Sequence, residues 1–394
     1  MAGGAETPRI ECIELFPLHV PFRQLVRETM ARSEGGLGMA IPSEEPWLGG
    51  DFVIARVHAD DGSQGIAEAF VWLPETGVSP RELVAQVRDA LARYVLGASP
   101  FDVRRIRYRM DSNVARCDVA KGLLDMALYD LMGKITGRPA HDSMGGRMVD
   151  SLPLCALIPL MDPAAMIQMA SAFKDMGHTT FRFKLGRSIV EDRAIMAAAR
   201  EELGGEVRLR VDYNQAYRPE EAVRAIQAIE PFGIDVAEQP VRLDDWLGMA
   251  RVQSQVQTPL MAHEGCFSLT DISALVELGA VRVVGVNSER PGGVTQALSA
   301  IDYATERGLG VVLHNQPLGI ASAMQVHLAA ARAAVLGHAI ELFGHVMLED
   351  DLIVDPLVYG GGDVRVPTGP GFGVDLDLAA LDRYSTGPCV TVRA

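Results

Sequence analysis

Residues 181–184 read FRFK, and three comparable segments follow: LRVD at 209–212, DVAE at 235–238 and LMAHE at 260–264. Each segment is short, contains apolar residues typical of a buried strand and ends in a charged side chain. The carboxylates Asp212, Glu238 and Glu264 stand 26 positions apart in turn. That distance fits one strand, one helix and two short loops. Such units repeated in parallel close into a barrel whose strand ends face the same way, so the sequence predicts three carboxylates that converge at one end of a barrel.

Three carboxylates in a small volume repel one another strongly unless a cation lies between them. The spacing therefore predicts a divalent metal site formed by Asp212, Glu238 and Glu264. The alternative is that each of these carboxylates forms a salt bridge with a lysine or arginine of the barrel.

The length and composition indicate a globular enzyme with two domains. A chain of 394 residues exceeds one typical domain, so we expect a large barrel and a smaller domain. Apolar residues make up 48% and charged residues 22%, as in ordinary soluble proteins. The net charge of −15 argues against nucleic acid or an anionic membrane as a partner. An anionic small molecule stays possible as a substrate, because a bound metal and a few local bases can reverse the sign of the charge in a pocket.

The cysteines and the N-terminal residues bear on the cellular location. The five cysteines are scattered and no pair has metal-ligand spacing, so we expect reduced thiols. The first residues lack a basic stretch followed by a long apolar run, which argues against a secretory signal. No apolar run approaches the roughly 20 residues that span a bilayer. We expect a soluble, cytoplasmic protein.

The first part of the chain, residues 1–135, predicts an α+β domain. Strand-like alternation is followed by helical periodicity, without regular alternation of strand and helix. Within this domain, residues 21–50 lack a sustained period, and we expect a long mobile loop with a functional role there. The expected strands are 9–20, 52–59 and 65–70, and the expected helices are 80–96 and 114–136.

Strands and helices alternate after this domain. About eight strands are predicted between residues 152 and 342, so we expect a (β/α)8-type barrel over 147–349. The tail at 350–394 is rich in Gly and Pro, and we expect it to pack back on the first domain. The predicted fold class is therefore α/β: a modified TIM barrel with an N-terminal α+β capping domain that the C-terminal tail completes.

The active site of such a barrel lies at the carboxyl ends of the strands. Polar, mostly ionisable residues stand at seven successive strand ends, and strands with a purely structural role would tolerate most residue types there. These residues are Lys184, Asp212, Glu238, Glu264, Asn287, His314 and Glu341.

Several short motifs, taken together and in order, carry a resemblance over nearly the whole chain. The sequence resembles the enolase superfamily, in the branch of mandelate racemase, muconate cycloisomerase and the acid-sugar dehydratases. The motifs are DDG at 60–62, DMALYD at 125–130, GK at 133–134, KLG at 184–186, DYNQ at 212–215, EQP at 238–240, HEG at 263–265, GG at 292–293 and PGFGV at 370–374.

The resemblance implies a reaction and a role for each candidate residue. It implies that Mg2+ binds the substrate carboxylate and stabilises the enediolate formed when a base removes the α-proton. It also implies a small-molecule carboxylate as the partner and a homo-oligomer. The implied metal ligands are Asp212, Glu238 and Glu264, the implied base is Lys184, and His314 faces the other side of the substrate. The candidate substrate-binding residues are Arg182, where the family usually has a lysine, Asn214, Asn287, Glu341 as a hydrogen-bond donor, and His263 as a contact or a supporting residue.

Asn287 departs from the family pattern. Mandelate racemase and the sugar-acid dehydratases have an aspartate there that pairs with the histidine, and the cycloisomerases have a lysine. An asparagine can orient an imidazole but cannot stabilise its cation with a negative charge, so His314 is expected to be a weaker base than in a His-Asp pair. A dehydratase needs only one base and one acid, and the sequence therefore favours a metal-dependent dehydratase of a small hydroxy acid, sugar acid or hydroxyproline-like acid. The alternatives are a racemase or epimerase using Lys184 and His314, a cycloisomerase, and a non-catalytic barrel that binds carboxylates.

Overall fold

A four-stranded antiparallel sheet forms the centre of the capping domain. The computed structural model describes residues 7–32, 47–315 and 317–394. The strand order is β15-β1-β2-β3, with β1 at Ile10–Pro21, β2 at Gly49–Ala59, β3 at Gln64–Val71 and β15 at Val390–Arg393. The sheet packs on helix α6, which is buried along most of its length. Gly65 allows this close approach, because a Cβ atom there would lie 2.3 Å from the carbonyl oxygen of Ala127.

Short helices complete the capping domain around this sheet. A turn of π-helix at Gln86–Leu91 joins α3 to α4. The helices are α2 (Leu73–Thr76), α3 (Pro80–Ala85), α4 (Ala92–Val95), α5 (Val103–Asn113) and α6 (Asp118–Thr136).

Regular secondary structure occupies both ends of the expected loop over residues 21–50. Helix α1 spans Gln24–Arg32, and strand β2 begins at Gly49. The helix has one apolar side, because Val26 and Met30 are four residues apart and both pack toward the core. Residues 33–46 of the expected loop lie outside the described residues.

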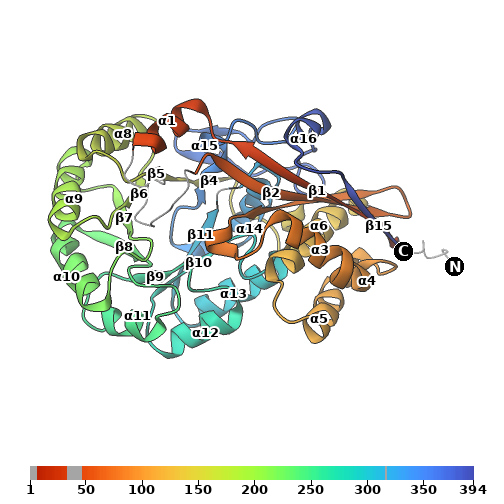
Figure 1. Cartoon of the computed structure of the whole chain (residues 1–394), viewed down its shortest axis with the longest axis horizontal. Helices are drawn as coiled ribbons and strands as arrows, with labels where there is room; N and C mark the ends of the chain where they lie inside the picture. The colour runs from red at the N-terminus through yellow and green to blue at the C-terminus, as the bar shows by residue number, and fades with distance from the viewer. Residues whose placement is uncertain (1–6, 33–46, 316) are drawn as a thin grey trace.

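Eight parallel strands form the second domain, which confirms the predicted barrel. The sheet order runs from β5 to β12 in sequence order, and a parallel bridge between Leu154 and Ile340 joins the two ends. Figure 1 shows helices α8–α14 arranged around these strands. The strands are β5 (Cys155–Ile158), β6 (Thr180–Lys184), β7 (Arg208–Asp212), β8 (Ile234–Glu238), β9 (Leu260–Ala262), β10 (Val283–Val286), β11 (Gly310–Asn315) and β12 (Glu341–Leu342).

Seven long helices follow strands β5 to β11, and only the short helix α15 (Gly344–Met347) follows β12. Helix α14 has the length and mean hydropathy of a membrane span, but 78% of it is buried inside the protein, as expected for a core helix. The helices are α8 (Pro163–Asp175), α9 (Ile189–Leu203), α10 (Pro219–Ile229), α11 (Trp246–Gln253), α12 (Leu269–Glu277), α13 (Val294–Glu306) and α14 (Gly319–Leu336).

The C-terminal segment crosses back to the capping domain. Strands β13 (Tyr359–Gly360) and β14 (Asp363–Arg365) form a small sheet with β4 (Ser151–Pro153), and α16 (Leu378–Tyr384) follows. The last strand, β15, then pairs with β1 in antiparallel fashion. Figure 1 shows this blue end of the chain beside the red strands of the capping domain.

Buried carboxylates attach the capping domain to the mouth of the barrel. Glu68 of β3 accepts backbone N–H groups of Leu318, Ile320 and Ala321 at the start of α14. Asp125 of α6 accepts the backbone N–H of Thr295 at the start of α13. Helix N-termini favour negative charge, and in a parallel barrel they lie at the carboxyl ends of the strands. The capping domain therefore covers the end of the barrel where the predicted site lies.

Candidate active site

The register of the strands brings the first predicted site residues into one row. Lys184 of β6 pairs with Asp212 of β7, and Asp212 pairs with Glu238 of β8. Arg182 precedes Lys184 by two positions and so lies on the same face of β6. All four side chains are buried. The charged residues at the ends of these predicted strands therefore lie at the same level of the barrel.

Asp212 is held by two cations. Its Oδ2 accepts from Lys184 Nζ at 2.5 Å and from the guanidinium of Arg182. Its Oδ1 accepts the backbone N–H of Asn214 at 2.9 Å. Burial alone would raise the pKa of Asp212, but Lys184 and Arg182 outweigh it and hold the pKa well below its usual value. Asp212 is therefore an ionised carboxylate with both oxygens engaged.

Glu238 and Glu264 form an acidic group with His263. One potential ligand atom from each residue lies within 4.8 Å of the others. Burial raises the pKa of Glu238 to about 8, with Asp212 and Glu264 acting in the same direction against Arg182. Burial and Asp212 also raise the pKa of Glu264. Both carboxylates thus lack the positive charge needed to offset their burial.

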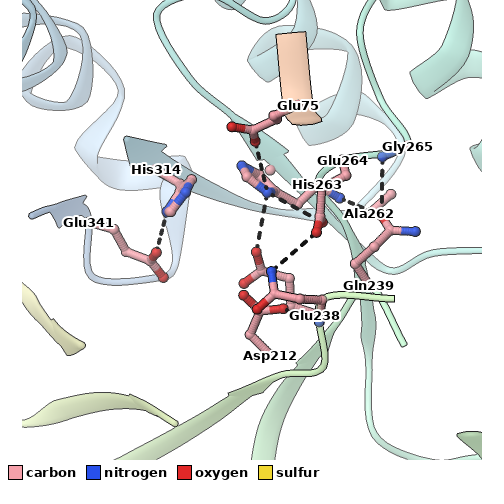
Figure 2. A network of polar contacts seen from close by, with 12 residues as sticks. Glu75, Asp212, Glu238, Gln239, Ala262, His263, Glu264, Gly265, His314 and Glu341 are labelled. Carbon is pink, nitrogen blue, oxygen red and sulfur yellow. Dashed lines mark hydrogen bonds and ion pairs between the residues drawn. The ribbon is translucent and has the colours of Figure 1, made fainter. Parts of the chain in front are cut away.

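His263 faces these carboxylates with ring nitrogen Nδ1. Its Nε2 lies 2.9 Å from Arg290 Nη2, and a guanidinium can only donate, so Nε2 accepts. Burial and Arg290 lower the pKa of His263 well below its usual value, which makes the ring neutral. The ring proton is therefore on Nδ1, which lies 3.4 Å from Glu238 Oε1 and 3.5 Å from Glu264 Oε2 (Figure 2).

His314 and Glu341 lie opposite one another on neighbouring strands β11 and β12. The imidazole Nδ1 is 2.5 Å from Glu341 Oε2. Arg182 and Arg210 also bind the carboxylate of Glu341. Burial lowers the pKa of His314 well below its usual value, and His263 and Arg182 add to this effect. Figure 2 shows the pair beside the acidic group.

The two candidate asparagines, Asn214 and Asn287, have different hydrogen-bond partners. Asn214 bridges two functional side chains: its Oδ1 accepts from Lys184 Nζ at 2.7 Å, and its Nδ2 donates to Glu264 at 3.2 Å. Its backbone is left-handed (φ 42°), a conformation that asparagine tolerates better than most residues. Asn287 instead accepts the backbone N–H of Arg290 at 2.6 Å. The expected contact between Asn287 and the imidazole of His314 is thus replaced by a contact within its own loop.

These side chains surround one small pocket. Seven of the ten predicted site residues line it, while Asp212, Glu238 and Glu341 are buried and are not among its lining residues. The capping domain contributes the remaining lining, which sequence reasoning missed. The lining residues are Phe70, Trp72, Glu75, Arg182, Lys184, Asn214, His263, Glu264, Asn287 and His314.

The missed residues include an ion pair between the two domains. Glu75 of the capping domain binds the guanidinium of buried Arg290, which follows strand β10. Arg290 lies two positions before the GG motif at 292–293, so the sequence motif could have pointed to this loop as part of the site. No sequence motif around Glu75 indicates a role in the site, because its contact depends on how the capping domain lies on the barrel.

The donor set of the acidic group fits a hard divalent cation. Oε2 of Glu264 is buried and has no hydrogen-bond partner among the residues that the structure describes. Carboxylate oxygens are the ligands that Mg2+ prefers. A cation between Glu238 and Glu264 would satisfy this oxygen and offset the burial of both groups.

Comparison with known proteins places this architecture in a family. Residues 47–145 match the mandelate racemase/muconate lactonizing enzyme N-terminal domain. Residues 165–380 match the family described as enolase C-terminal domain-like. The chain belongs to the mandelate racemase/muconate lactonizing enzyme branch of the enolase superfamily. It is an enzyme, and the members of this superfamily use Mg2+.

Relatives with related sequences are isomerases by name. The hydrophobic dipeptide epimerase of Enterococcus faecalis is 32% identical over 72% of this chain and 80% of its own length. The chloromuconate cycloisomerase of Cupriavidus pinatubonensis is 31% identical over 84% of this chain and 91% of its own. The N-succinyl-L-Arg/Lys racemase of Bacillus cereus is 26% identical over 84% and 90%, respectively. These names favour the racemase or epimerase alternative over the expected dehydratase.

Solved structures share the fold across the whole chain. The crystal structure of the Bacillus cereus N-succinyl Arg/Lys racemase superposes with a TM-score of 0.88 at 24% identity, covering 98% of this chain and 100% of that one. The muconate lactonizing enzyme of Pseudomonas fluorescens superposes with a TM-score of 0.87 at 26% identity, covering 96% and 100%.

Proposed function

We propose that the protein is a racemase or epimerase that moves the proton at the carbon α to a substrate carboxylate. The observation that carries this proposal is that Lys184 and His314 line the same pocket from strands β6 and β11, which are not neighbours in the barrel. A reaction that inverts one carbon needs a proton acceptor on each face of that carbon. The pocket offers an amine and an imidazole for these roles.

The two side chains divide the proton transfer between them. In one direction Lys184, as a neutral amine, takes the α-proton at Nζ while the imidazolium of His314 delivers a proton to the other face. In the reverse direction the neutral imidazole of His314 takes the α-proton and the ammonium of Lys184 delivers one. The carboxamide of Asn214 fixes Nζ through its 2.7 Å hydrogen bond. The neutral form of buried His314 leaves a ring nitrogen able to accept a proton.

We assign the metal to Glu238 and Glu264, with Asp212 beside them. The buried, unpartnered oxygen of Glu264 and the raised pKa of Glu238 support this assignment. Mg2+, when bound, supplies positive charge that stabilises the negative charge developing on the substrate carboxylate.

The names of the relatives and the pocket lining support a proposal for the substrate class. The named epimerase and racemase act, by name, on dipeptides and N-succinylated amino acids. We propose an amino-acid derivative with an acylated α-nitrogen. Phe70, Trp72 and Glu75 of the capping domain line the pocket beside the barrel residues and would contact the rest of such a substrate.

Incubation with candidate substrates in D2O tests the proposal. N-acyl amino acids, dipeptides, sugar acids and hydroxyprolines are incubated with Mg2+ and followed by NMR and chiral chromatography. We expect deuterium at the α-carbon and inversion of configuration for an acylated amino acid or dipeptide. Loss of water from a hydroxy acid without inversion would instead establish a dehydratase and refute the proposal.

The metal assignment predicts that Mg2+ stabilises the Glu264→Gln variant less than the wild-type protein. Mg2+ at about 100 times its Kd should stabilise the wild-type protein by about 2.7 kcal/mol. The amide that replaces the Glu264 carboxylate is a neutral and weaker ligand, so the same Mg2+ concentration should raise the melting temperature much less. Differential scanning calorimetry with Mg2+ and with EDTA measures the shift.

A matched variant separates the site from general charge effects. Glu220 is exposed and pairs with Arg251. Glu220→Gln should keep the full Mg2+-dependent shift. An unchanged shift in Glu264→Gln would place the metal elsewhere.

A further inference from the structure

Glu341 binds three side chains at the mouth of the barrel. It is fully buried, and it binds Arg210 through Oε1, and both Arg182 and His314 through Oε2. Two guanidinium groups favour its ionised form. An ionised carboxylate accepts hydrogen bonds but cannot donate one. This environment conflicts with the role expected from the family resemblance, in which Glu341 donates a hydrogen bond to the substrate.

The contacts of His314 define which ring nitrogen carries the proton. Nδ1 lies 2.5 Å from Glu341 Oε2 and 3.3 Å from Arg182 Nη1. Nδ1 cannot both donate to the carboxylate and accept from the guanidinium, and the much shorter distance identifies the carboxylate as its partner. Nδ1 therefore carries the proton, and the lone pair of the neutral ring is on Nε2.

The ring of His314 is also fixed in its plane. The ring of His263 packs against it edge to face, with centroids 4.3 Å apart, and Phe343 packs from 5.8 Å. The pocket reaches the imidazole. Packing and the Glu341 contact together hold the ring in one orientation.

The residue expected to pair with this histidine is engaged elsewhere. Oδ1 of Asn287 accepts the backbone N–H of Arg290, and the backbone N–H of Asn287 donates to the carbonyl of Arg290. In contrast, the parallel register of β11 and β12 places His314 directly opposite Glu341. The negative partner of the imidazole thus comes from the next strand along the barrel.

We infer that Glu341 is the positioning residue of His314: it fixes the Nδ1–H tautomer and stabilises the imidazolium that forms when Nε2 accepts a proton. Arg210 and Arg182 hold the carboxylate in place for this role. The inference rests on the proposed function, since it assigns His314 as the proton acceptor on one face. It also gives the imidazole a carboxylate partner although position 287 is an asparagine.

Face-specific exchange in Glu341→Gln tests the inference. The rate of α-proton exchange in D2O is measured separately for each enantiomer of the substrate. Exchange of the enantiomer that His314 deprotonates should fall about 100-fold or more, because a neutral amide does not stabilise the imidazolium. Exchange of the enantiomer that Lys184 deprotonates should stay within about threefold of wild type. An equal loss for both enantiomers, or a loss for neither, would overturn the inference.

The capping domain offers a matched control. Glu14 accepts from Arg56 Nε and from His58 Nε2, each at 2.7 Å, so it is also a glutamate held by an arginine and a histidine. It lies in strand β1, outside the pocket. Glu14→Gln should leave both exchange rates unchanged.

A measurement on the wild-type protein keeps the inference testable if Glu341→Gln does not fold. Nitrogen-15 NMR of the histidine rings, with the His314 signals assigned by their absence in His314→Asn, reports the tautomer directly. We expect the Nδ1–H form, and an Nε2–H form would overturn the pairing. This readout needs no substrate. If no compound shows exchange, the proposed function fails while the tautomer still decides the pairing.

Discussion

Replacing Lys184 with methionine should slow α-proton exchange of one substrate enantiomer by about 10²–10⁴-fold, the range typical of a lost general base. Methionine has a similar length and no proton-accepting nitrogen. Lys184 Nζ is held by Asp212 and Asn214 in the wall of the pocket. Exchange of the opposite enantiomer depends on His314 and should fall much less, although net inversion should be lost. Proton exchange in D2O with each pure enantiomer measures both rates.

The control for this prediction is Lys174→Met, because Lys174 is an exposed lysine on helix α8. It should keep both exchange rates. Equal loss for both enantiomers in Lys184→Met would mean that the lysine mainly supports the acidic group through Asp212. Unchanged exchange for both would exclude it as the base.

The sequence was sufficient to predict the barrel, for a physical reason. Strands buried on both sides must be apolar, so charged residues at their ends stand out, as in FRFK and LRVD. The spacing between Asp212 and Glu238 then reflects one strand–helix unit. The pairing at the carboxyl ends of β6, β7 and β8 places Lys184, Asp212 and Glu238 side by side.

The partners of the site residues could not be predicted in the same way. The expectation for His314 followed the residue at position 287, but the loop after β10 turns Asn287 toward Arg290. Glu341 reaches His314 through the pairing of β11 with β12, which spans only two residue pairs. Which residue pairs with His314 depends on the detailed geometry of the loop after β10 and of the β11–β12 pairing. The periodicity of the sequence does not contain this information.

Contacts across the two domains are the other part that sequence patterns do not reveal. Glu75 and Arg290 are 215 positions apart, and their ion pair forms only when the capping domain lies on the barrel. Helix α1 was missed because its apolar side is carried mainly by Val26 and Met30. A nine-residue helix of this kind gains its stability from the tertiary contacts of that side.

Arg182→Met should reduce the free energy of unfolding by about 3–5 kcal/mol in the absence of metal, the cost typical of removing one partner from a buried charge group. Arg182 is 2% exposed and binds Asp212, Glu238 and Glu341. Without the guanidinium these carboxylates repel one another in a buried region. Urea unfolding in EDTA measures the loss.

Added Mg2+ should recover part of the stability lost in Arg182→Met, because a cation bound by the acidic group again supplies positive charge beside Glu238 and Asp212. Arg182→Lys keeps one charge and should lose less. Arg251→Met removes an exposed ion pair with Glu220 and should cost less than about 1 kcal/mol. A stability loss in Arg182→Met as small as that in Arg251→Met would show that the guanidinium does not neutralise these carboxylates. An equal loss with and without Mg2+ would show that the metal does not compensate for the missing guanidinium.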